Sequence, residues 1–322
     1  MPIPRPTRRA ALALAAALAV PSAWSQDKRP IRILVPGPAG SAMDAYLRAV
    51  SAPLGQRTGH PIVVDNLPGA GGTLATAQAA RAAPDGLTLE IVSSNHVVNP
   101  FLFKNLAYDA LGSFTPITII GVVPLVLVVS PQLQAATVAE LIAQIKARPA
   151  GSFNYGSLGI GTALHLAGEL FDTQAGVKTT HVPYKDASAL TADLVSGQIQ
   201  LAYLALPSVS QLVKTGRLRA LGLTTAQRSP ALPDVPAIAD TLPGYVYDAW
   251  LALLAPKGTP AATVQGYYEA LQGAMAEPAV QQAIAAQGLA PSMLAPAQAQ
   301  AYLRSELDKH ARLVERAGVQ PQ

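Results

Sequence analysis

Short apolar runs alternate along the chain with segments whose apolar residues recur at helical spacing. Runs that are rich in β-branched residues and bounded by proline or glycine predict buried strands. These runs cover residues 31–35, 61–64, 87–92, 154–155, 179–183, 199–204 and 218–224. Helical spacing predicts a helix that begins near Ala42, behind Ser41 and Asp44 as a capping pair, and further helices over residues 73–82, 137–147, 163–175, 187–195, 259–287 and 296–317. This alternation predicts parallel α/β sheets.

The segment 114–129 is a long β-rich run with Pro124 in its middle. Because proline cannot donate a hydrogen bond to a sheet, we expect two strands here, or one strand that leaves its sheet. A second β-rich segment, 245–254, brings the chain back. Two such crossings predict two lobes, and a cleft between lobes is a common place for a small ligand. The first lobe would comprise residues 26–125 with 248–322, and the second lobe residues 126–247.

The first 25 residues have the order of a secretory signal peptide. A basic stretch ends at Arg9, an apolar run covers residues 10–20, and small residues precede a cleavage point after Ser25. This run is too short to cross a bilayer, which needs about 20 apolar residues. We therefore expect export to the periplasm and a mature chain that starts at Gln26. The pair Arg8-Arg9 leaves ordinary secretion and twin-arginine export both open.

Charge and composition exclude several functional classes. The chain has 322 residues, of which 13% are charged, and it contains no cysteine. The absence of cysteine excludes disulfides, thiolate catalysis and cysteine-ligated metals. The net charge of +4 includes three arginines of the predicted signal peptide, so the remainder is nearly neutral and carries no basic stripe for nucleic acid. The five histidines are scattered without the spacing of metal ligands, so we expect no metal and no cofactor.

A glycine-rich loop, residues 157–162, joins a predicted strand to a predicted helix. Gly159 and Gly161 let the backbone approach a ligand closely, and Ser157 and Thr162 offer hydroxyl groups. The free N–H groups at a helix N-terminus attract anions, and a carboxylate suits them as well as a phosphate does. An ordinary strand–helix turn capped by Thr162 would have the same sequence, so a binding role and a structural role both stay open.

A second loop of this kind, residues 36–41, joins the first predicted strand to the first helix. Two such loops, one in each lobe, could hold the two ends of a small acid. Neither loop has the Gly-Lys-Ser/Thr of a phosphate-binding P-loop, and the glycines of residues 69–72 do not complete the dinucleotide fingerprint, so we interpret them as a turn. The candidate ligand contacts outside the loop of residues 157–162 are Gly37, Ala39, Gly40, Ser41, Ser93, Ser94, His165, Tyr184, Lys185, Tyr203 and Leu204.

No catalytic constellation stands out in the sequence. Ser157 and His165 together would suit a hydrolase, but no Gly-x-Ser-x-Gly surrounds the serine, and the histidine lies inside a predicted helix. We therefore interpret His165 as a structural residue or a ligand contact. Asp44 is interpreted as a helix cap, and Lys185 either pairs with an anion or is solvated.

Characteristic sequence pieces run through nearly the whole mature chain. They are Arg29-Pro30-Ile31-Arg32, Val35-Pro36, Asp65-Asn66-Leu67-Pro68-Gly69-Ala70-Gly71-Gly72, Ala83-Pro84-Asp85-Gly86, Asn99-Pro100, Tyr108-Asp109, the glycine-rich segment from Ser157 to Glu169, His181-Val182-Pro183-Tyr184-Lys185, Leu206-Pro207-Ser208, Gly216-Arg217-Leu218-Arg219-Ala220, residues 228–236, Leu242-Pro243-Gly244-Tyr245 and residues 253–260. In the order and number of these pieces, the chain resembles the Bug-type periplasmic solute-binding receptors of tripartite tricarboxylate transporters.

This resemblance implies a two-lobe, type II periplasmic-binding-protein fold with a small, usually carboxylated ligand held between the two loops. It also implies a membrane permease as partner, although many such receptors stand alone. The chain departs from the family in the first loop, which usually reads Pro-Gly-Gly and here reads Ala39-Gly40-Ser41. It departs again at Leu204-Ala205, where the family often has Asp-Asn. A leucine cannot receive an ammonium group, so this departure argues against amino-acid ligands and favours an apolar ligand body, unless Leu204 packs inside its lobe.

The sequence therefore favours a monomeric receptor that captures a small carboxylic acid without catalysis. One alternative keeps the fold but presents the solute to a membrane sensor kinase. Another is an enzyme that uses the cleft, for which the sequence offers neither a nucleophile–base pair nor a metal cluster. Co-purification with a permease or a kinase, or turnover of a bound acid, would distinguish the three.

Overall fold

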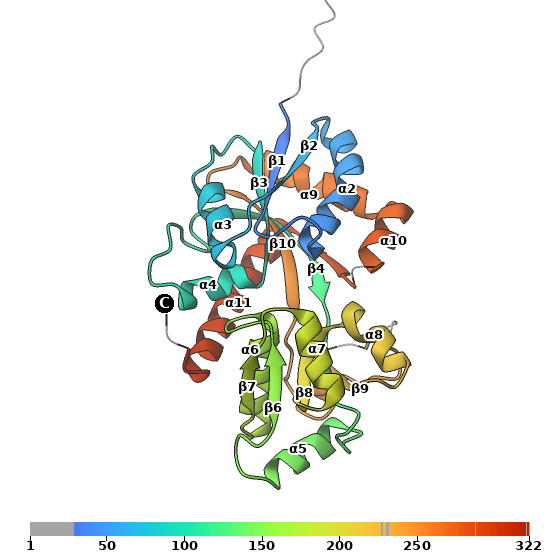
Figure 1. Ribbon diagram of the computed structural model, residues 1–322. Helices are drawn as coiled ribbons and strands as arrows, with labels where there is room; N and C mark the ends of the chain where they lie inside the picture. The colour runs from blue at the N-terminus through green and yellow to red at the C-terminus, as the bar shows by residue number, and fades with distance from the viewer. Residues whose placement is uncertain (1–28, 227, 230–231, 287, 320, 322) are drawn as a thin grey trace, which may run out of the picture.

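The structure is a computed structural model that describes residues 29–226, 228–229, 232–286, 288–319 and 321. The predicted signal peptide lies outside these residues. Figure 1 shows two lobes, an upper one in blue, cyan and orange and a lower one in green and yellow. Each lobe is built on its own β-sheet. Within the described residues, no helix is both long enough and apolar enough to cross a membrane.

The first sheet has six strands among the described residues, in the order β11-β4-β10-β3-β1-β2. Strands β2 and β3 run parallel to β1, whereas β10 runs antiparallel to β3 and β4. The expected parallel sheet is therefore correct for the first three strands and wrong for the returning strand. The strands are β1 (Ile31–Val35), β2 (Ile62–Asn66), β3 (Thr88–Ser93), β4 (Phe114–Val123), β10 (Ala249–Pro256) and β11 (Ala290–Leu294).

The second sheet has five strands among the described residues, in the order β7-β6-β8-β5-β9. Strand β6 is parallel to β7 and β8, and β5 is antiparallel to β8 and β9. The long run around Pro124 thus forms two strands in two different sheets, as the proline predicts. The strands are β5 (Leu125–Val129), β6 (Asn154–Ser157), β7 (Thr180–Pro183), β8 (Leu201–Ala205) and β9 (Arg219–Leu223).

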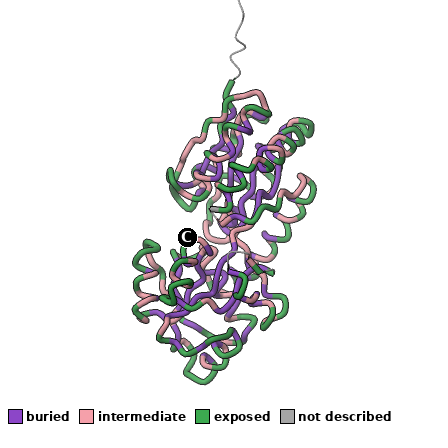
Figure 2. The backbone as a smooth tube through the Cα atoms, turned by 90° about the vertical axis from the view of Figure 1, so that its right-hand side faces the viewer, coloured by how far each residue is buried: buried purple, intermediate pink, exposed green. Residues whose placement is uncertain are grey.

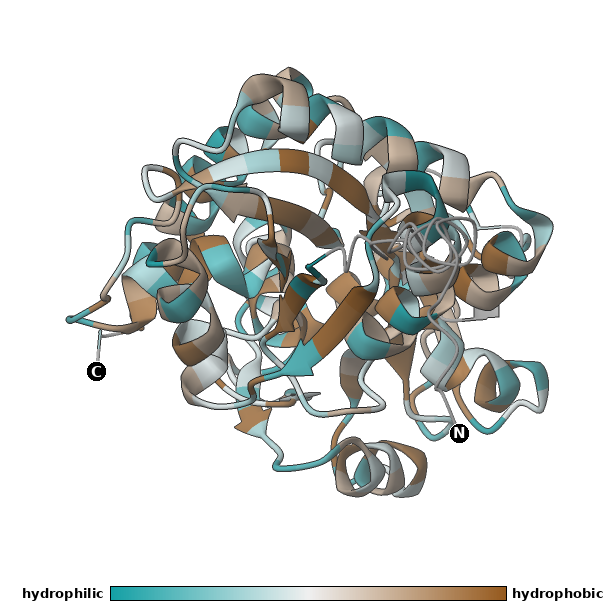
Figure 3. Cartoon of the chain, turned by 90° about the horizontal axis from the view of Figure 1, so that it is seen from above, coloured by the Kyte–Doolittle hydropathy of each residue, from teal (hydrophilic) through white to brown (hydrophobic). Residues whose placement is uncertain are grey.

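Helices cover both faces of each sheet, and the central strands between them are largely buried (Figure 2) and apolar (Figure 3), whereas the edge strands β2, β7 and β11 are more exposed. On the first sheet, one face carries α2 (Ala42–Thr58), α9 (Ala261–Met275) and α10 (Pro278–Ala286), and the other carries α3 (Thr73–Ala80), α4 (Asn95–Leu102) and α11 (Pro296–Arg316). On the second sheet, one face carries α5 (Val138–Lys146) and α6 (Ala163–Ala175), and the other carries α7 (Ala187–Ser196) and α8 (Leu206–Lys214).

Several elements differ from the sequence predictions. The single helix expected over residues 259–287 is wrong, because α9 and α10 are separate helices. Helices α4 and α8 and strand β11 were not expected. Each of the two helices contains a proline, and a proline in a segment argues against predicting a helix there. Pro100 lies inside α4, and Pro207 lies at the start of α8.

The two lobes touch on opposite sides of the molecule at two glycines. Leu102, the last residue of α4 in the first lobe, occupies the space that a side chain on Gly161 of the second lobe would need. At the second contact, Pro207 of α8 in the second lobe occupies the space that a side chain on Gly288 of the first lobe would need. These contacts bring the carboxyl end of β6 against the first lobe, which places the glycine-rich loop at the boundary between the lobes.

Candidate functional site

Two strand–helix loops, residues 36–41 and 157–162, have the same construction in the two lobes. The first follows β1 and starts α2, and the second follows β6 and starts α6. In each loop a hydroxyl caps the helix, because the side chain of Ser41 accepts the N–H of Asp44 and that of Thr162 accepts the N–H of His165, both at 3.4 Å. These N-caps explain why both helices begin where the sequence predicts.

The likeness continues into the first turns of the helices. Gly40 donates its N–H to Oδ2 of Asp44 at 2.9 Å, and Gly161 donates its N–H to Nδ1 of His165 at 3.1 Å. Each acceptor has a charged neighbour one turn later. Nε of Arg48 donates to Oδ2 of Asp44 at 2.9 Å, and Oε1 of Glu169 lies 3.6 Å from Nε2 of His165.

These internal hydrogen bonds leave a specific set of amides unused. Within the described residues, no hydrogen bond occupies the N–H groups of Ala39 and Ala42 in the first loop and helix, or those of Leu158, Ile160 and Ala163 in the second. Unpaired N–H groups at a helix N-terminus carry partial positive charge and favour an anion. Each lobe therefore presents one set of amides that suits a carboxylate.

The hydroxyls of the second loop are directed inward, contrary to expectation. Ser157 is fully buried, its Oγ lies 2.6 Å from Nε2 of His181, and it accepts the N–H of Gly159 at 3.1 Å. The hydroxyl of Thr162 donates to the carbonyl of Gly159 at 2.7 Å. The prediction that these two hydroxyls donate to a ligand is therefore not supported, because loop atoms and His181 already use them.

An aromatic cluster lies directly behind this loop. The imidazole rings of His165 and His181 have centroids 4.1 Å apart, and the ring of Tyr155 lies 5.0 Å from that of His181. The hydroxyl of Tyr155 donates to Oε1 of Glu169 at 2.6 Å. Burial lowers the pKa of both histidines to about 4, so both rings are neutral at neutral pH. His165 is a structural residue here, in agreement with one of its two predicted roles.

Sequence reasoning did not include His181, Tyr155 or Glu169 among the site residues. Tyr155 lies two residues before Ser157 on a strand, and Glu169 lies one turn after His165, so helical and strand spacing could have suggested both. No local signal connects His181 to Ser157, because β6 and β7 become neighbours only in the folded sheet.

On the first lobe, Ser93 and Ser94 end β3 beside the first loop. Strands β1 and β3 are parallel neighbours, so their carboxyl ends lie at one edge of the sheet. Within the described residues, neither serine hydroxyl makes a hydrogen bond, although Ser94 is buried. The carbonyl of Gly37 accepts Nδ2 of Asn66 at 3.2 Å, which holds the first loop against β2. These two serines keep their hydroxyls available at the predicted site.

Tyr184 and Lys185 lie between β7 and α7. The hydroxyl of Tyr184 donates to Oδ2 of Asp193 at 2.8 Å, so it is directed toward α7. Lys185 is exposed, and the described residues hold no ion pair with it. The structure thus keeps Lys185 as a free cation near the loops and gives Tyr184 a partner of its own.

Tyr203 and Leu204 are placed differently from expectation. Tyr203 is 0% exposed in the core that covers α5 and α6, and Leu204 is 4% exposed in the core on the opposite face, under α7 and α8. Adjacent strand residues point to opposite faces, so both side chains are committed to packing. The alternative that Leu204 packs inside its lobe is the one that fits, and neither residue belongs to the proposed site.

The apolar surface at the loop comes from other residues. Leu158 is 39% exposed and Ile160 is 54% exposed, and they flank Gly159 in the second loop. Together they form a small apolar surface at this loop. These two side chains lie beside the N–H groups of Leu158 and Ile160, which have no hydrogen-bond partner within the described residues.

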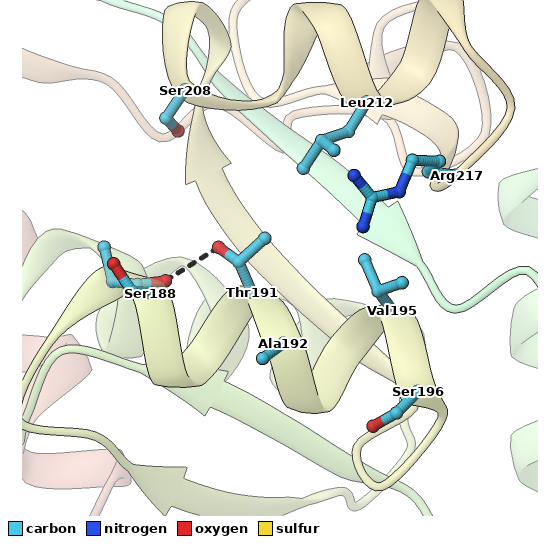
Figure 4. A pocket seen from close by; sticks show the side chains of 9 residues that line it. Ser188, Thr191, Ala192, Val195, Ser196, Ser208, Leu212 and Arg217 are labelled. Carbon is cyan, nitrogen blue, oxygen red and sulfur yellow. Dashed lines mark hydrogen bonds between the residues drawn. The ribbon is translucent and has the colours of Figure 1, made fainter.

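Other depressions lie away from the two loops. A groove of about 600 Å³ runs between α7 and α8, where Arg217 extends between Leu212 and Val195 (Figure 4). A second cavity, of about 530 Å³, lies at the contact between Pro207 and Gly288. None of the predicted site residues lines either one. Among the described residues, no group of three or more acidic or histidine side chains could hold a metal ion.

Comparisons with known proteins agree with this arrangement. Residues 46–319 match the family model described as the tripartite tricarboxylate transporter family receptor. The chain is 34% identical to BugT of Bordetella pertussis over 94% of both chains. The structure of the periplasmic binding protein BugD superposes with a TM-score of 0.74 at 30% identity, covering 91% of this chain and 99% of that one. A protein of R. palustris solved with adipate gives a TM-score of 0.77 at 30% identity, covering 93% and 100%.

The family model covers most of both lobes and includes the second loop, residues 157–162. The two-lobe periplasmic-binding-protein fold that the sequence pieces implied is confirmed, and so is the role of a solute-binding receptor. The chain belongs to the family of tripartite tricarboxylate transporter receptors.

Proposed function

We propose that this receptor is exported, binds a small carboxylic acid without an amino group between its two loops, and delivers it to a membrane permease. The observation that carries the proposal is the paired construction of the loops. Each lobe leaves amides unused at the N-terminus of a helix, in α2 and in α6, and so each can hold one carboxylate. An acid with carboxylates at both ends suits this pair best.

The middle of the ligand would face an apolar and weakly polar surface. Leu158 and Ile160 supply the exposed apolar area, and burying such area is favourable by roughly 25 cal/mol per Å². Ser93 and Ser94 supply hydroxyls that no hydrogen bond occupies in the part of the chain that the structure describes. The R. palustris relative was solved with adipate, whose four methylene groups between two carboxylates match this description.

The carboxylate beside the first loop is buried, including its Oδ1, which no hydrogen bond occupies within the described residues, so it is not open to an ammonium group. Asp44, the carboxylate of the first loop, is buried and already holds the amide of Gly40 and the guanidinium of Arg48. This pairing lowers the pKa of Asp44 to about 2. An ammonium group placed between the loops would meet neutral hydroxyls but, among the described residues, no accessible carboxylate. It would lose water without gaining an opposite charge, which costs at least ~1–3 kcal/mol.

The proposal is tested by placing a negative charge at each anion position. Ala42→Glu and Ala163→Glu add a carboxylate to the first turn of α2 and α6, where acidic residues stabilise a helix. We expect both variants to fold normally and to bind adipate at least about tenfold more weakly by calorimetry, since a lost charged hydrogen bond is worth about 1.5–3 kcal/mol.

Ala297→Glu is the matched control, because it adds the same charge to the first turn of α11, away from the loops. This control should bind adipate as the unchanged protein does. Unchanged binding in both loop variants would place the ligand elsewhere. Ala42→Gln and Ala163→Gln separate the effect of the charge from that of the side-chain volume.

A further inference from the structure

The two adjacent histidines behind the second loop, whose rings are tilted by 36° to each other, differ in their freedom to accept a proton. His165 uses Nδ1 to accept the N–H of Gly161 at 3.1 Å, so its proton sits on Nε2, on the side of Glu169. A second proton would have to enter at Nδ1 and would break the bond to Gly161. The loop therefore keeps His165 neutral.

His181 has no such restriction. Its Nε2 lies 2.6 Å from the hydroxyl of Ser157, and a hydroxyl can donate to a neutral imidazole or accept from a protonated one. Within the described residues, Nδ1 of His181 has no hydrogen-bond partner, and the side chain is partly exposed. Ser157 can redirect its proton to the carbonyl of Gly159, which lies 3.1 Å away. Protonation of His181 thus leaves the loop intact.

Titratable and charged groups surround the histidine pair on several elements. Tyr155 on β6 and Glu169 on α6 lie next to the rings, Asp172 on α6 and Tyr203 on β8 lie around Tyr155, and the exposed Lys185 follows β7. The carboxylates are already engaged, Glu169 by the hydroxyl of Tyr155 and Asp172 by the amide and hydroxyl of Thr179. Burial lowers the pKa of His181 to about 4.

We propose that His181 is a positioning residue of the ligand loop and that it takes up one proton from solvent when a carboxylate binds at that loop. This inference rests on the proposed function. A carboxylate at the amides of Leu158 and Ile160 adds a negative charge close to the histidine, and opposite charges favour the protonated form. The imidazolium then donates to Ser157, which keeps accepting the amide of Gly159. The receptor therefore holds its acid more tightly as the pH falls.

The test is calorimetry with adipate at about pH 5.5 and about pH 7.5, in two buffers of different ionisation enthalpy, which reports proton uptake directly. We expect the unchanged protein to take up a proton at the lower pH and to bind about tenfold more tightly there. This gain corresponds to a return of the pKa of His181 from about 4 to the ordinary histidine value of about 6.5. His181→Gln keeps a hydrogen-bonding group for Ser157 but cannot be protonated, so it should bind adipate without proton uptake and with a flatter pH profile.

Two further variants complete the experiment. His181→Phe removes the hydrogen bond as well, so binding should weaken at both pH values. His60→Gln alters a histidine of the first lobe, far from the loop in the sheet order, and should keep the pH profile of the unchanged protein. Adipate titrates identically with every variant, so any difference in slope belongs to the protein.

The outcomes separate this inference from the function beneath it. Equal pH profiles and equal proton uptake in the unchanged protein and His181→Gln would overturn the role of His181 while leaving carboxylate binding in place. Failure of the unchanged protein to bind adipate or any other carboxylate at either pH would overturn the proposed function, and this inference with it.

Discussion

Asp44 and His165 hold equivalent positions in the two lobes, because each side chain accepts the N–H of the glycine four residues before it. The two residues differ in charge. Asp44 is an ionised carboxylate paired with Arg48, whereas His165 is a neutral ring above Glu169. The same loop geometry is thus stabilised by a carboxylate in the first lobe and by a neutral imidazole in the second lobe. In the second lobe this places the histidine pair His165 and His181 beside the proposed ligand loop.

The loop hydroxyls should matter for binding although they do not face the ligand. Thr162→Ala removes the N-cap of α6 and the bond to the carbonyl of Gly159, and should cost about 1 kcal/mol of unfolding free energy. Ser157→Ala leaves the amide of Gly159 without its acceptor. Both should weaken adipate binding about tenfold, because the amides lose their fixed direction. Thr162→Ser should restore binding in calorimetry, and unchanged affinity in both alanine variants would contradict this account.

Gly161 should not tolerate a side chain. It has a φ of +77° and faces Leu102 across the lobe boundary. Gly161→Ala should therefore lose more stability than Gly176→Ala, which has a φ of +61° but open space around it. The control isolates the backbone cost of about 1–2 kcal/mol. Adding Leu102→Ala should recover part of the difference in urea denaturation. Equal losses in the two single variants would show that the lobes do not touch here in solution.

Glu90 should make stability fall as the pH rises. It is fully buried on β3, and burial raises its pKa to about 8. The unfolded chain ionises near pH 4.5, so the folded state binds the extra proton between about pH 4.5 and pH 8, and stability is lost across that window. Glu90→Gln should remove this slope and raise the melting temperature near pH 8 but not near pH 4. Parallel melting profiles for the two proteins would refute it.

Export should remove the first 25 residues. The order of basic, apolar and small residues predicts cleavage after Ser25. Mass measurement of protein from the periplasm should give a chain that starts at Gln26 or within a few residues of it. An intact N-terminus on cytoplasmic protein would contradict the prediction.

Local sequence signals predicted several features of the fold that depend on a single helix cap or a single proline. The start of α6 at Ala163 followed from Thr162, and the change of sheet followed from Pro124. The break between α9 and α10 was missed although it has a local signal, because Pro278 disfavours a helix through Glu277 and forms the first residue of α10. The direction of β10 depends on strand pairing across the whole chain and has no local signature.

The construction of the two candidate loops could be predicted from the sequence, but the contacts of their side chains could not. Both loops follow from glycines and capping hydroxyls at the ends of strands, which are local features. The inward direction of the Ser157 hydroxyl depends on His181, which comes from a different strand. Leu204 was assigned to the ligand from its resemblance to other receptors, but strand alternation places it under α7 and α8.

The central claim is that the site holds a carboxylic acid without an amino group, and a thermal-shift screen tests it most directly. Adipate, succinate and benzoate are compared with aspartate and glutamate, on the unchanged protein and on Ala42→Glu. A ligand at 100 times its Kd adds about 2.7 kcal/mol of stability, which is easily measured. We predict that non-amino carboxylates raise the melting temperature of the unchanged protein and not of the variant. Stabilisation by aspartate and glutamate alone would contradict the account.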